Sequence, residues 1–558
     1  MTVTARRGTE LRCRNWRAEA LLRLLENVLE VGERPEELVV YASIGKAVKD
    51  WDAYQRIVDA LHHIEEDQTL VLQTGRPVAV LNTHAAAPMV VSAVNNTVGN
   101  WATEERFYSR LAEHKTIWGG LTAAAWQYIG RQGVLGGTYE LLRAALEKHF
   151  REPSAPHRWV LTAGLGGMGS SQPISARMLE LSTLVVEADP AKLAKLEAAG
   201  GIDLVLDDLD DALATISAAA AERQSVAVGL LGNAADVFPA VAASGARPDI
   251  VTDQTAAHDA RYGYLPSGYT LESWAEARAT DPERVERDAR VSMATQVRAM
   301  LALKQRGSVV FENGNNLRVQ ASHILSEAEK QQVFAEIPGF MEGYLRPLFS
   351  RGIGPFRWMI LSGDDNDLAV VDDLAATMFP ERSEIARWIG LARRHIPAQG
   401  LPARSCWLGY GERSALALAV NEAVADGRIS APVAFSRDHL DSAGMTHPRI
   451  GTEGMRDDSD GVTDWPILDA MLLASGGADL VAVHSGGGGY SGWMQSAGVT
   501  VVADGTGAAA TRLRQALDLD SGLGVIRHAT AGYEDALDAV QRSHEPGAHG
   551  VPLTLIRN

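Results

Sequence analysis

A glycine-rich turn between an expected strand and an expected helix constrains the fold of this chain more than any other feature. The apolar run at residues 159–162 predicts a strand. It is followed at residues 164–169 by the sequence GLGGMG, which has the spacing G-x-G-x-x-G. In such a turn the first glycine permits a tight reversal, the second lets a ligand approach the backbone, and the third lets the helix pack on the strand. The pattern indicates a parallel α/β domain that binds a dinucleotide, with an ordinary glycine-rich turn as the alternative.

Further strand and helix patterns continue after the turn. Short apolar runs at residues 182–187, 202–206, 225–231 and 249–252 predict strands, and the segments between them predict helices. Pro173 falls in the first turn of one of these helices, where its missing N–H would have no partner anyway. Strands that alternate with helices predict a doubly wound parallel sheet. The flanking segments lack this regular alternation, so we expect them to form a separate α/β core.

The charge balance and the cysteines limit the class of protein. The 558 residues include 70 acidic and 52 basic side chains, a net charge of −18 that disfavours nucleic acid and anionic lipid as partners. Cys13 and Cys406 cannot make a disulfide framework or a metal site of familiar spacing. No apolar stretch fits a signal peptide or a membrane span. We therefore expect a cytoplasmic protein without a metal.

Polar residues follow the expected strands of the parallel sheet. Glu187 closes the second strand, 23 residues after Gly164, and a carboxylate there accepts hydrogen bonds from ribose hydroxyls and repels a 2′-phosphate, which favours NAD over NADP. Asn233 and Ala234 follow another strand, where the alternative is a plain helix N-cap. The polar loop at residues 253–259 follows the next, and an ordinary surface loop would look similar.

Three further segments could carry chemistry. Cys406 is either a thiolate nucleophile or a small buried residue. Residues 437–441 combine an arginine, a histidine and two carboxylates, which suits proton transfer but also a surface loop. Arg346, Arg351 and Arg357 could clamp a substrate carboxylate, and we expect at least one of the three to be structural.

Several sequence blocks together resemble a known family. They are LQTG at residues 72–75, WVLTAGLGGMG at 159–169, VTDQT at 251–255, QGLPAR at 399–404 and RDHLDS at 437–442. Over nearly its whole length the chain resembles urocanase, the urocanate hydratase. The resemblance implies a homodimer in which an NAD-binding domain, residues 131–340, is inserted into a discontinuous α/β core made of residues 1–130 and 341–558.

The resemblance also implies an activity. It is that of a hydro-lyase which adds water to an imidazole-acrylate, as in the breakdown of histidine derivatives such as ergothioneine. The tightly bound NAD⁺ acts as an electrophile rather than as a hydride acceptor, so the net reaction is redox-neutral.

Site residues are implied by position. The expected NAD contacts, together with the glycine turn, are Gly164, Gly166, Gly167, Met168, Gly169, Glu187, Lys192, Asn233, Ala234, Gln254, Thr255, Ala256, Ala257, His258, Tyr264, Leu265 and Gly488. The expected catalytic residues are Cys406, Asp438, His439, Asp441 and Tyr41. The expected substrate residues are Ala42, Ser43, His84, Gly120, Asn313, Arg351 and Arg357.

Several positions depart from the family pattern. Ala42 and Ser43 stand where the family has two glycines, Gly120 replaces a glutamine, and Asn313 replaces a tyrosine. The remaining departures are Lys192 near a family arginine, Ala85, Ala86 and Met89 for serine, asparagine and arginine, and Ser485 for the second histidine of a His-His-Gly-Gly-Gly loop.

The departures predict an altered pocket. Many of them exchange a large or polar side chain for a smaller or less polar one, which should admit a substituent on the imidazole ring. We therefore expect S-methylthiourocanate or thiourocanate as the substrate. The alternatives are a plain urocanate hydratase and an NAD-dependent oxidoreductase. A catalytically inactive NAD sensor is disfavoured by the retained Cys406 and by residues 437–441.

Overall fold

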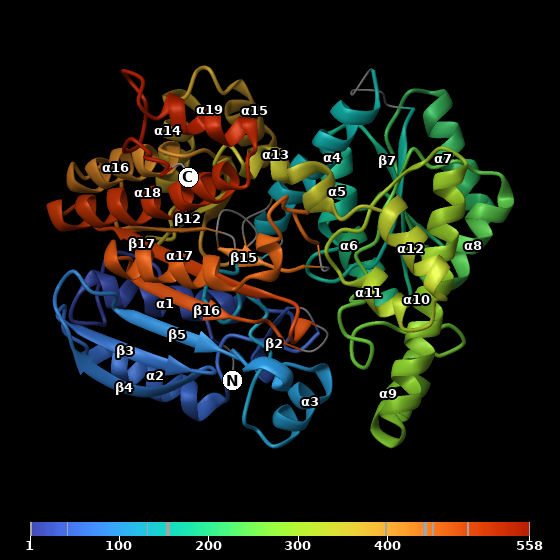
Figure 1. Ribbon diagram of the computed structural model, residues 1–558, viewed down its shortest axis with the longest axis horizontal. Helices are drawn as coiled ribbons and strands as arrows, with labels where there is room; N and C mark the ends of the chain where they lie inside the picture. The colour runs from blue at the N-terminus through green and yellow to red at the C-terminus, as the bar shows by residue number, and fades with distance from the viewer. Residues whose placement is uncertain are drawn as a thin grey trace. The chain divides into compact units, whose positions relative to one another are not determined.

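Two units make up the chain in the computed structural model (Figure 1). The structure describes residues 3–41, 43–130, 132–151, 157–396, 399–437, 439, 444–448, 451–487 and 490–556. Unit 1 comprises Met1–Gly133, Arg346–Pro448 and Gly454–Asn558, and unit 2 comprises Val134–Leu345 and Arg449–Glu453. The domain boundaries expected from the sequence stay a prediction.

Unit 2 contains a six-stranded parallel sheet. The order of its strands is β11-β10-β6-β7-β9-β8. The strands are β6 (Trp159–Ala163), β7 (Ser182–Glu187), β8 (Leu204–Leu206), β9 (Ala227–Leu231), β10 (Ile250–Val251) and β11 (Val309–Val310). The helices are α4 (Gln132–His149), α5 (Ser171–Met178), α6 (Pro190–Ala198), α7 (Leu209–Ala221), α8 (Ala234–Ser244), α9 (Leu271–Thr280), α10 (Pro282–Gln305), α11 (Leu317–Ser322) and α12 (Glu327–Glu336).

Both faces of this sheet are covered by helices, as the sequence predicted. Figure 1 shows α5 and α6 on one side of β7, with α7 and α8 on the other. Successive residues of β7 serve the two faces, because Val185 packs with Leu193 of α6 while Leu184 packs with Phe238 of α8. The doubly wound fold is therefore confirmed. β11 was not expected from the sequence, and β9 lies between β7 and β8 although β8 comes first in the chain.

Unit 1 contains a nine-stranded mixed sheet. Its order is β13-β12-β14-β17-β16-β5-β3-β4, with β15 paired to β17. The strands are β3 (Gln68–Gln73), β4 (Arg76–Asn82), β5 (Val90–Val94), β12 (Gly354–Ile360), β13 (Ala403–Leu408), β14 (Val433–Arg437), β15 (Met445–Thr446), β16 (Leu480–His484) and β17 (Gln495–Ala503), and a separate hairpin pairs β1 (Val39–Tyr41) with β2 (Gly45–Lys46). The helices are α1 (Trp16–Glu30), α2 (Trp51–His63), α3 (Glu104–Ala112), α13 (Arg346–Phe349), α14 (Asp365–Met378), α15 (Ser383–His395), α16 (Glu412–Ala425), α17 (Asp464–Ser475), α18 (Gly507–Thr530) and α19 (Glu534–Arg542).

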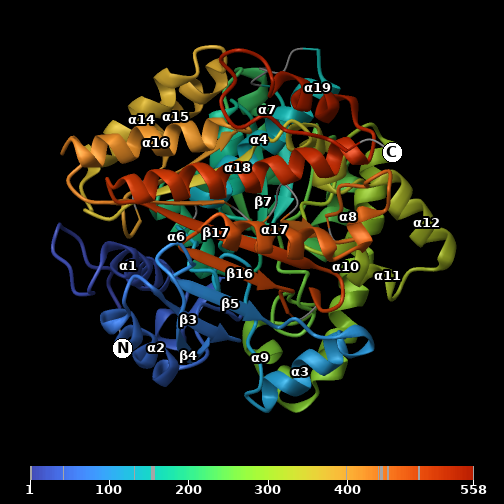
Figure 2. The same ribbon diagram turned by 60° about the vertical axis from the view of Figure 1, so that its left-hand side comes forward.

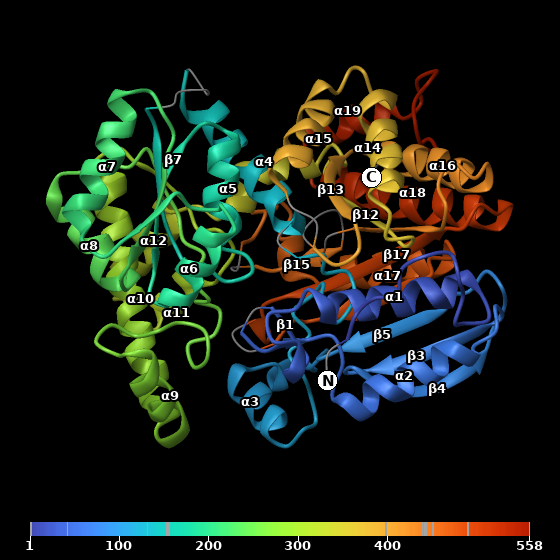
Figure 3. The same cartoon turned by 180° about the vertical axis from the view of Figure 1, so that it is seen from behind.

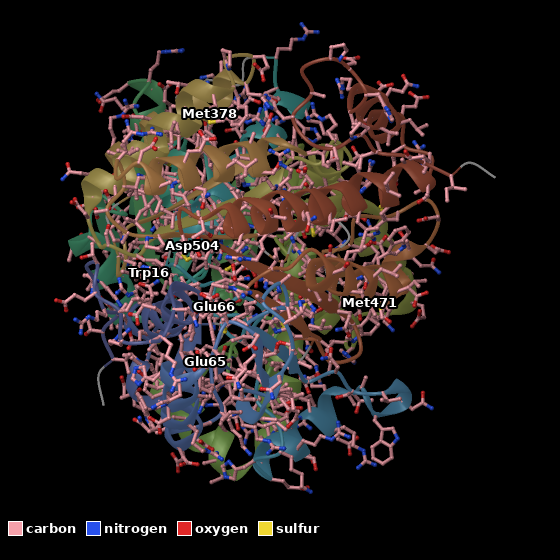
Figure 4. All side chains as sticks on the ribbon, turned by 90° about the vertical axis from the view of Figure 1, so that its left-hand side faces the viewer. Trp16, Glu65, Glu66, Met378, Met471 and Asp504 are labelled. Carbon is pink, nitrogen blue, oxygen red and sulfur yellow. The ribbon has the colours of Figure 1, made fainter. Side chains whose placement is uncertain are left out.

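Helices pack against this sheet. Helix α18 crosses the sheet at β17, and α17 packs on β16 and β17 (Figure 2). Helices α14 and α15 pack beside β12 and β13 (Figure 3). Side chains fill the space between these layers, and Met471 of α17, which is 64% exposed, points away from it (Figure 4). Among the described residues, no helix combines the length and the apolarity that a membrane span needs.

The two faces of the sheet near β12 differ in chemistry. Ser405, Arg357 and Ser436 stand opposite one another on β13, β12 and β14, so their side chains share one face. Cys406, Phe356 and Arg437 stand opposite one another in the same way and share the other face. We call the first the polar face and the second the helix face, because Arg437 pairs there with carboxylates of α17 and α18.

Candidate active site

The glycine turn of unit 2 lies where the strand order of the parallel sheet reverses. From β6 the chain continues to β7 on one side of the sheet and later returns to β10 on the other side. In such sheets ligands bind outside the carboxyl ends of the strands at this reversal. Residues 164–169 follow β6 and residues 252–258 follow β10, so the two loops flank the crevice where a dinucleotide is expected.

The glycines of this turn meet different surroundings. Gly164 has φ +87°, and a Cβ on it would lie 2.5 Å from the carbonyl oxygen of Gln254. A Cβ on Gly169 would lie 2.0 Å from the carbonyl oxygen of Gly164. Both positions therefore need glycine for close backbone approach. Gly166 has open space within 4 Å instead, which is the room that a pyrophosphate would need.

Glu187 is tied to the same turn. Its carboxylate accepts from the backbone N–H of Leu165 at 2.7 Å and from that of Asp189 at 3.0 Å, and Lys192 Nζ lies 3.9 Å away. The carboxylate therefore holds the turn in addition to any bond it makes with a ribose. Lys192 is half exposed beside it.

A buried network lies under the loop that follows β10. Asp253 accepts from Thr255 Oγ1 at 2.6 Å and from Gln296 Nε2 at 2.8 Å, and also from the amide of Asn315. Burial raises the pKa of the Asp253 carboxyl to about 6, although these hydrogen bonds lower it. The network fixes the backbone of the loop that carries Ala256, Ala257 and His258, all of which are at least partly buried.

Other expected cofactor residues meet at this edge. Asn233 caps α8 by accepting from Ala235 N–H at 2.9 Å, and its Nδ2 donates to the carbonyl oxygen of Leu265 at 3.0 Å. Tyr264 is buried and donates to Gln296 Oε1 at 2.8 Å. Asn233 is therefore a helix N-cap, and its side chain also positions the backbone at Leu265.

Two buried amides at this edge have unused hydrogen-bonding groups. Gln254 Nε2 donates to the carbonyl oxygen of Asn313 at 2.8 Å, whereas Asn313 Nδ2 has no partner among the described residues. Neither amide atom of Gln172, which is 1% exposed at the start of α5, has a partner among them either. Sequence reasoning missed Gln172. A bound dinucleotide would fit a site that offers open space above Gly166 and unused amide groups around it.

Unit 1 gathers a second set of polar side chains on the polar face of its sheet. Arg357 is 2% exposed, and its Nη1 donates to the carbonyl oxygen of Gln127 at 2.8 Å. The Gln127 amide donates to the carbonyl oxygen of Val499 at 2.7 Å, and its Oε1 lies 2.9 Å from Nε2 of His439. Nδ1 of His439 lies 3.0 Å from the hydroxyl of Ser496. This network joins residues from four distant parts of the chain.

A second histidine lies against the first. His484 ends β16, and its ring centroid lies 4.7 Å from that of His439. Burial holds the pKa of His439 well below its usual range, with smaller effects from His484, Arg437 and Arg357. Burial alone lowers the pKa of His484 to about 3. Both imidazoles are therefore neutral at physiological pH.

Tyr41 and Gly120 lie next to these histidines. The hydroxyl of Tyr41 accepts from Thr122 Oγ1 at 3.0 Å, and its ring stacks on that of Tyr128 at 4.8 Å. A Cβ on Gly120 would lie 3.6 Å from the Tyr41 ring, and one on Gly119 would lie 3.4 Å from Nδ1 of His484. Because Gly119 and Gly120 are consecutive, one segment of backbone contacts both the Tyr41 ring and the His484 ring. We call Tyr41, Gln127, Arg357, His439 and His484 the histidine cluster.

The other expected substrate residues lie elsewhere. Ser43 has φ +68°, a left-handed conformation in which the family glycine at this position would be unstrained. His84 is exposed and precedes β5, whose far end pairs with His484, so the structure does not bring it to the histidine cluster. Arg351 is exposed, and its Nε donates to the carbonyl oxygen of Pro347 at 3.1 Å. Asn313 belongs to unit 2, beside Gln254.

Cys406 and the 437–441 segment separate on the two faces of the sheet. Cys406 is buried on the helix face, and this position favours its interpretation as a small packed residue. Arg437 pairs on the same face with Asp520 at 2.7 Å and with Asp469 at 2.9 Å, so it stabilises the fold rather than moving protons. The active-site role that the resemblance implies for Cys406 stays a prediction. Four expected site residues lie outside the described residues: Ala42, Asp438, Asp441 and Gly488.

Sequence reasoning also missed Gln127 and His484. Gln127 has no local signal, because its partners are distant in sequence. His484 did have one, since it follows the apolar run at residues 480–483 and precedes a glycine-rich loop, and a polar residue after an apolar run is the pattern that drew attention to Asn233.

Comparisons with known proteins cover nearly all of the chain. Residues 3–127 match the urocanase N-terminal domain, residues 130–344 the urocanase Rossmann-like domain, and residues 347–542 the urocanase C-terminal domain. A protein named S-methyl thiourocanate hydratase, from Variovorax sp. (strain JCM 16519 / RA8), is 49% identical over 534 residues, which are 96% of this chain and 95% of that protein. On these matches, the chain belongs to the urocanase family.

Proposed function

We propose that this chain is an NAD⁺-dependent, redox-neutral hydratase that adds water to a ring-substituted urocanate, with S-methylthiourocanate as the substrate. The observation that carries the proposal is the 49% identity, over 96% of the chain, to a protein named S-methyl thiourocanate hydratase. The match of unit 2 to a Rossmann-like domain supports the proposal that NAD⁺ is the cofactor. The histidine cluster supports the proposal of a polar substrate site with aromatic rings around it.

The cofactor is assigned to the carboxyl edge of the unit 2 sheet. The backbone at Gly166 would face the pyrophosphate, and Glu187 would accept from the ribose hydroxyls. Gln254 and Asn233 hold the neighbouring loops in place. When bound, the dinucleotide supplies an electrophilic nicotinamide, which the protein itself cannot provide.

The substrate is assigned to the histidine cluster. Arg357 supplies a buried cation that suits the carboxylate of an acrylate side chain. His439 and His484 are neutral, so neither ring repels a cationic form of the substrate imidazole. Gly120 stands beside the Tyr41 ring where the family has a glutamine, and the loss of that side chain suits a ring substituent.

Turnover without added cofactor tests the hydratase assignment. The purified full chain, supplied with S-methylthiourocanate and no NAD⁺, should remove the ultraviolet absorbance of the conjugated substrate while no NADH absorbance grows. An oxidoreductase would instead require a stoichiometric oxidant. Turnover that begins only with added NAD⁺ and yields equal NADH would contradict the proposal.

A pair of glycine substitutions tests the cofactor site. Gly166→Ala places a Cβ in open space, so the variant should fold normally and release less dinucleotide on denaturation than wild type. Gly169→Ala meets the Gly164 carbonyl oxygen and should destabilise unit 2 as well. Gly137→Ala, in open space on α4, is the matched control and should retain the cofactor. If Gly166→Ala releases as much dinucleotide as wild type, the assignment of the cofactor to this turn is wrong.

The homodimer and the cytoplasmic location belong to the same proposal. Both rest on the family resemblance and on the composition. Light scattering of the purified protein should give twice the 59.8 kDa chain mass.

A further inference from the structure

The two histidines of the cluster differ in what their ring nitrogens bond. The Gln127 amide donates to Val499 and Thr500, so its oxygen is the group that faces His439. That oxygen can only accept, which places the ring proton of His439 on Nε2 and leaves Nδ1 to accept from the Ser496 hydroxyl. Both nitrogens of His439 are therefore used within the protein.

His484 has the opposite property. It is 0% exposed, and neither of its ring nitrogens has a hydrogen-bond partner among the described residues. A buried polar atom without a partner destabilises a fold, and native proteins keep few of them. Here two such atoms stand on one ring, at the carboxyl end of β16.

The described residues around His484 do not supply the missing partners. Gly119, which carries no side chain, faces Nδ1, and the tilted ring of His439 lies on another side. His484 also stands opposite Ser496 and beside Val94 in the sheet, but the Ser496 hydroxyl is taken by His439. Burial keeps the ring neutral, with one donor and one acceptor.

We propose that His484 is a substrate-binding residue, one ring nitrogen of which hydrogen bonds the imidazole of the bound imidazole-acrylate, while His439 only holds the position of the His484 ring. The proposal rests on the function proposed above. A substrate imidazole also carries one donor and one acceptor, so it can form one N–H···N bond with a neutral histidine of either tautomer, without a charge on either ring.

Equilibrium binding of two unreactive ligands tests the proposal on the protein purified with its cofactor. Imidazolepropionate carries the ring nitrogens and lacks the reactive double bond, and 3-phenylpropionate lacks the nitrogens. His484→Leu should weaken imidazolepropionate binding about tenfold or more, equal to about 1.4 kcal/mol, and change the Kd of 3-phenylpropionate less than about twofold. His484→Gln, which keeps a donor and an acceptor, should recover part of the loss.

Two controls separate binding from structure. His528→Gln changes a buried histidine outside the cluster, one whose Nδ1 bonds the Gly524 carbonyl oxygen, and should leave both dissociation constants unchanged. Denaturant unfolding without ligand should show His484→Leu to be more stable than wild type, because the variant loses two unsatisfied polar atoms.

The outcomes distinguish a failure of the role proposed for His484 from a failure of the proposed function. If wild type and His484→Leu bind imidazolepropionate equally and the variant is less stable, the His484 ring stabilises the fold by bonding a buried water. The role in substrate binding is then wrong, while the proposed function still stands. If wild type binds neither ligand, the proposed function fails and the inference fails with it.

Discussion

The two units of this chain build their sheets in different ways. In unit 2 each parallel strand and the loop after it come from one continuous segment of about 150 residues, and the candidate cofactor residues follow their strands directly. In unit 1 the sheet joins strands from the beginning and the end of the chain, as when β5 pairs with β16. A local motif can therefore reveal a site in unit 2, whereas the site in unit 1 exists only after folding.

Long-range ion pairs should show this difference most strongly. Asp520 accepts from Arg437 and Arg413 in a fully buried site. Asp520→Ala therefore removes a negative charge that both buried guanidinium groups pair with. We expect unit 1 to lose about 3–5 kcal/mol of unfolding free energy. The exposed Asp373, paired with Arg393, is the control, and Asp373→Ala should cost less than about 1 kcal/mol. Equal losses in denaturant titrations would mean that buried ion pairs do not hold unit 1 together.

Acidification should act with opposite signs through two buried groups, His484 in unit 1 and Asp253 in unit 2. The pKa of His484 falls from 6.5 to about 3 on folding, so the unfolded chain takes up the proton first and unit 1 loses stability as pH falls below 6.5. The pKa of Asp253 rises from 3.8 to about 6, so the folded chain takes up the proton first and unit 2 gains stability from about pH 6 down to 3.8.

These shifts give measurable changes. Between pH 7 and pH 5 we expect His484 to contribute a loss of about 2 kcal/mol in unit 1 and Asp253 a gain of about 1 kcal/mol in unit 2. Amide hydrogen exchange, corrected for its intrinsic pH dependence, should report them separately in β16 and β6. His484→Leu should remove its share of the slope in unit 1 only. The same sign for the contributions of His484 and Asp253 would contradict the assignment of these buried groups.

Cys406 offers a smaller test of the helix face. If its side chain only packs there, Cys406→Ala should cost about 1 kcal/mol of stability and change turnover less than about threefold. Cys406→Ser should cost more stability, because it buries a hydroxyl. If both variants stay fully stable and lose turnover by orders of magnitude, the thiol is catalytic, as the family resemblance implies.

The smallest expected effect concerns backbone strain. Ser43→Gly relieves a residue with φ +68° and should raise the unfolding free energy by about 0.5–1 kcal/mol. Arg223→Gly makes the matched change in unit 2, at φ +55°, and should stabilise by a similar amount. Only Ser43→Gly, next to Tyr41, should alter the preference among urocanate analogues. A change of preference in Arg223→Gly as well would point to an effect that is not local.

The same contrast explains what the sequence could predict. The strands and helix starts of unit 2 follow from short-range patterns, and α6, α7 and α8 begin at the caps Asp189, Asp208 and Asn233. The face that Cys406 occupies could not be predicted, because it depends on the register of β13 against β12. The role of Gln127 could not be predicted either, because its hydrogen-bond partners are hundreds of residues away in the sequence.

A competition assay tests the central claim most directly. Wild-type protein, incubated with equal concentrations of S-methylthiourocanate and urocanate and without added NAD⁺, should consume S-methylthiourocanate with a kcat/KM at least about tenfold higher. That ratio requires only about 1.4 kcal/mol of differential transition-state binding, which one filled space beside Gly120 can provide. Preferential consumption of urocanate would contradict the account of an altered pocket.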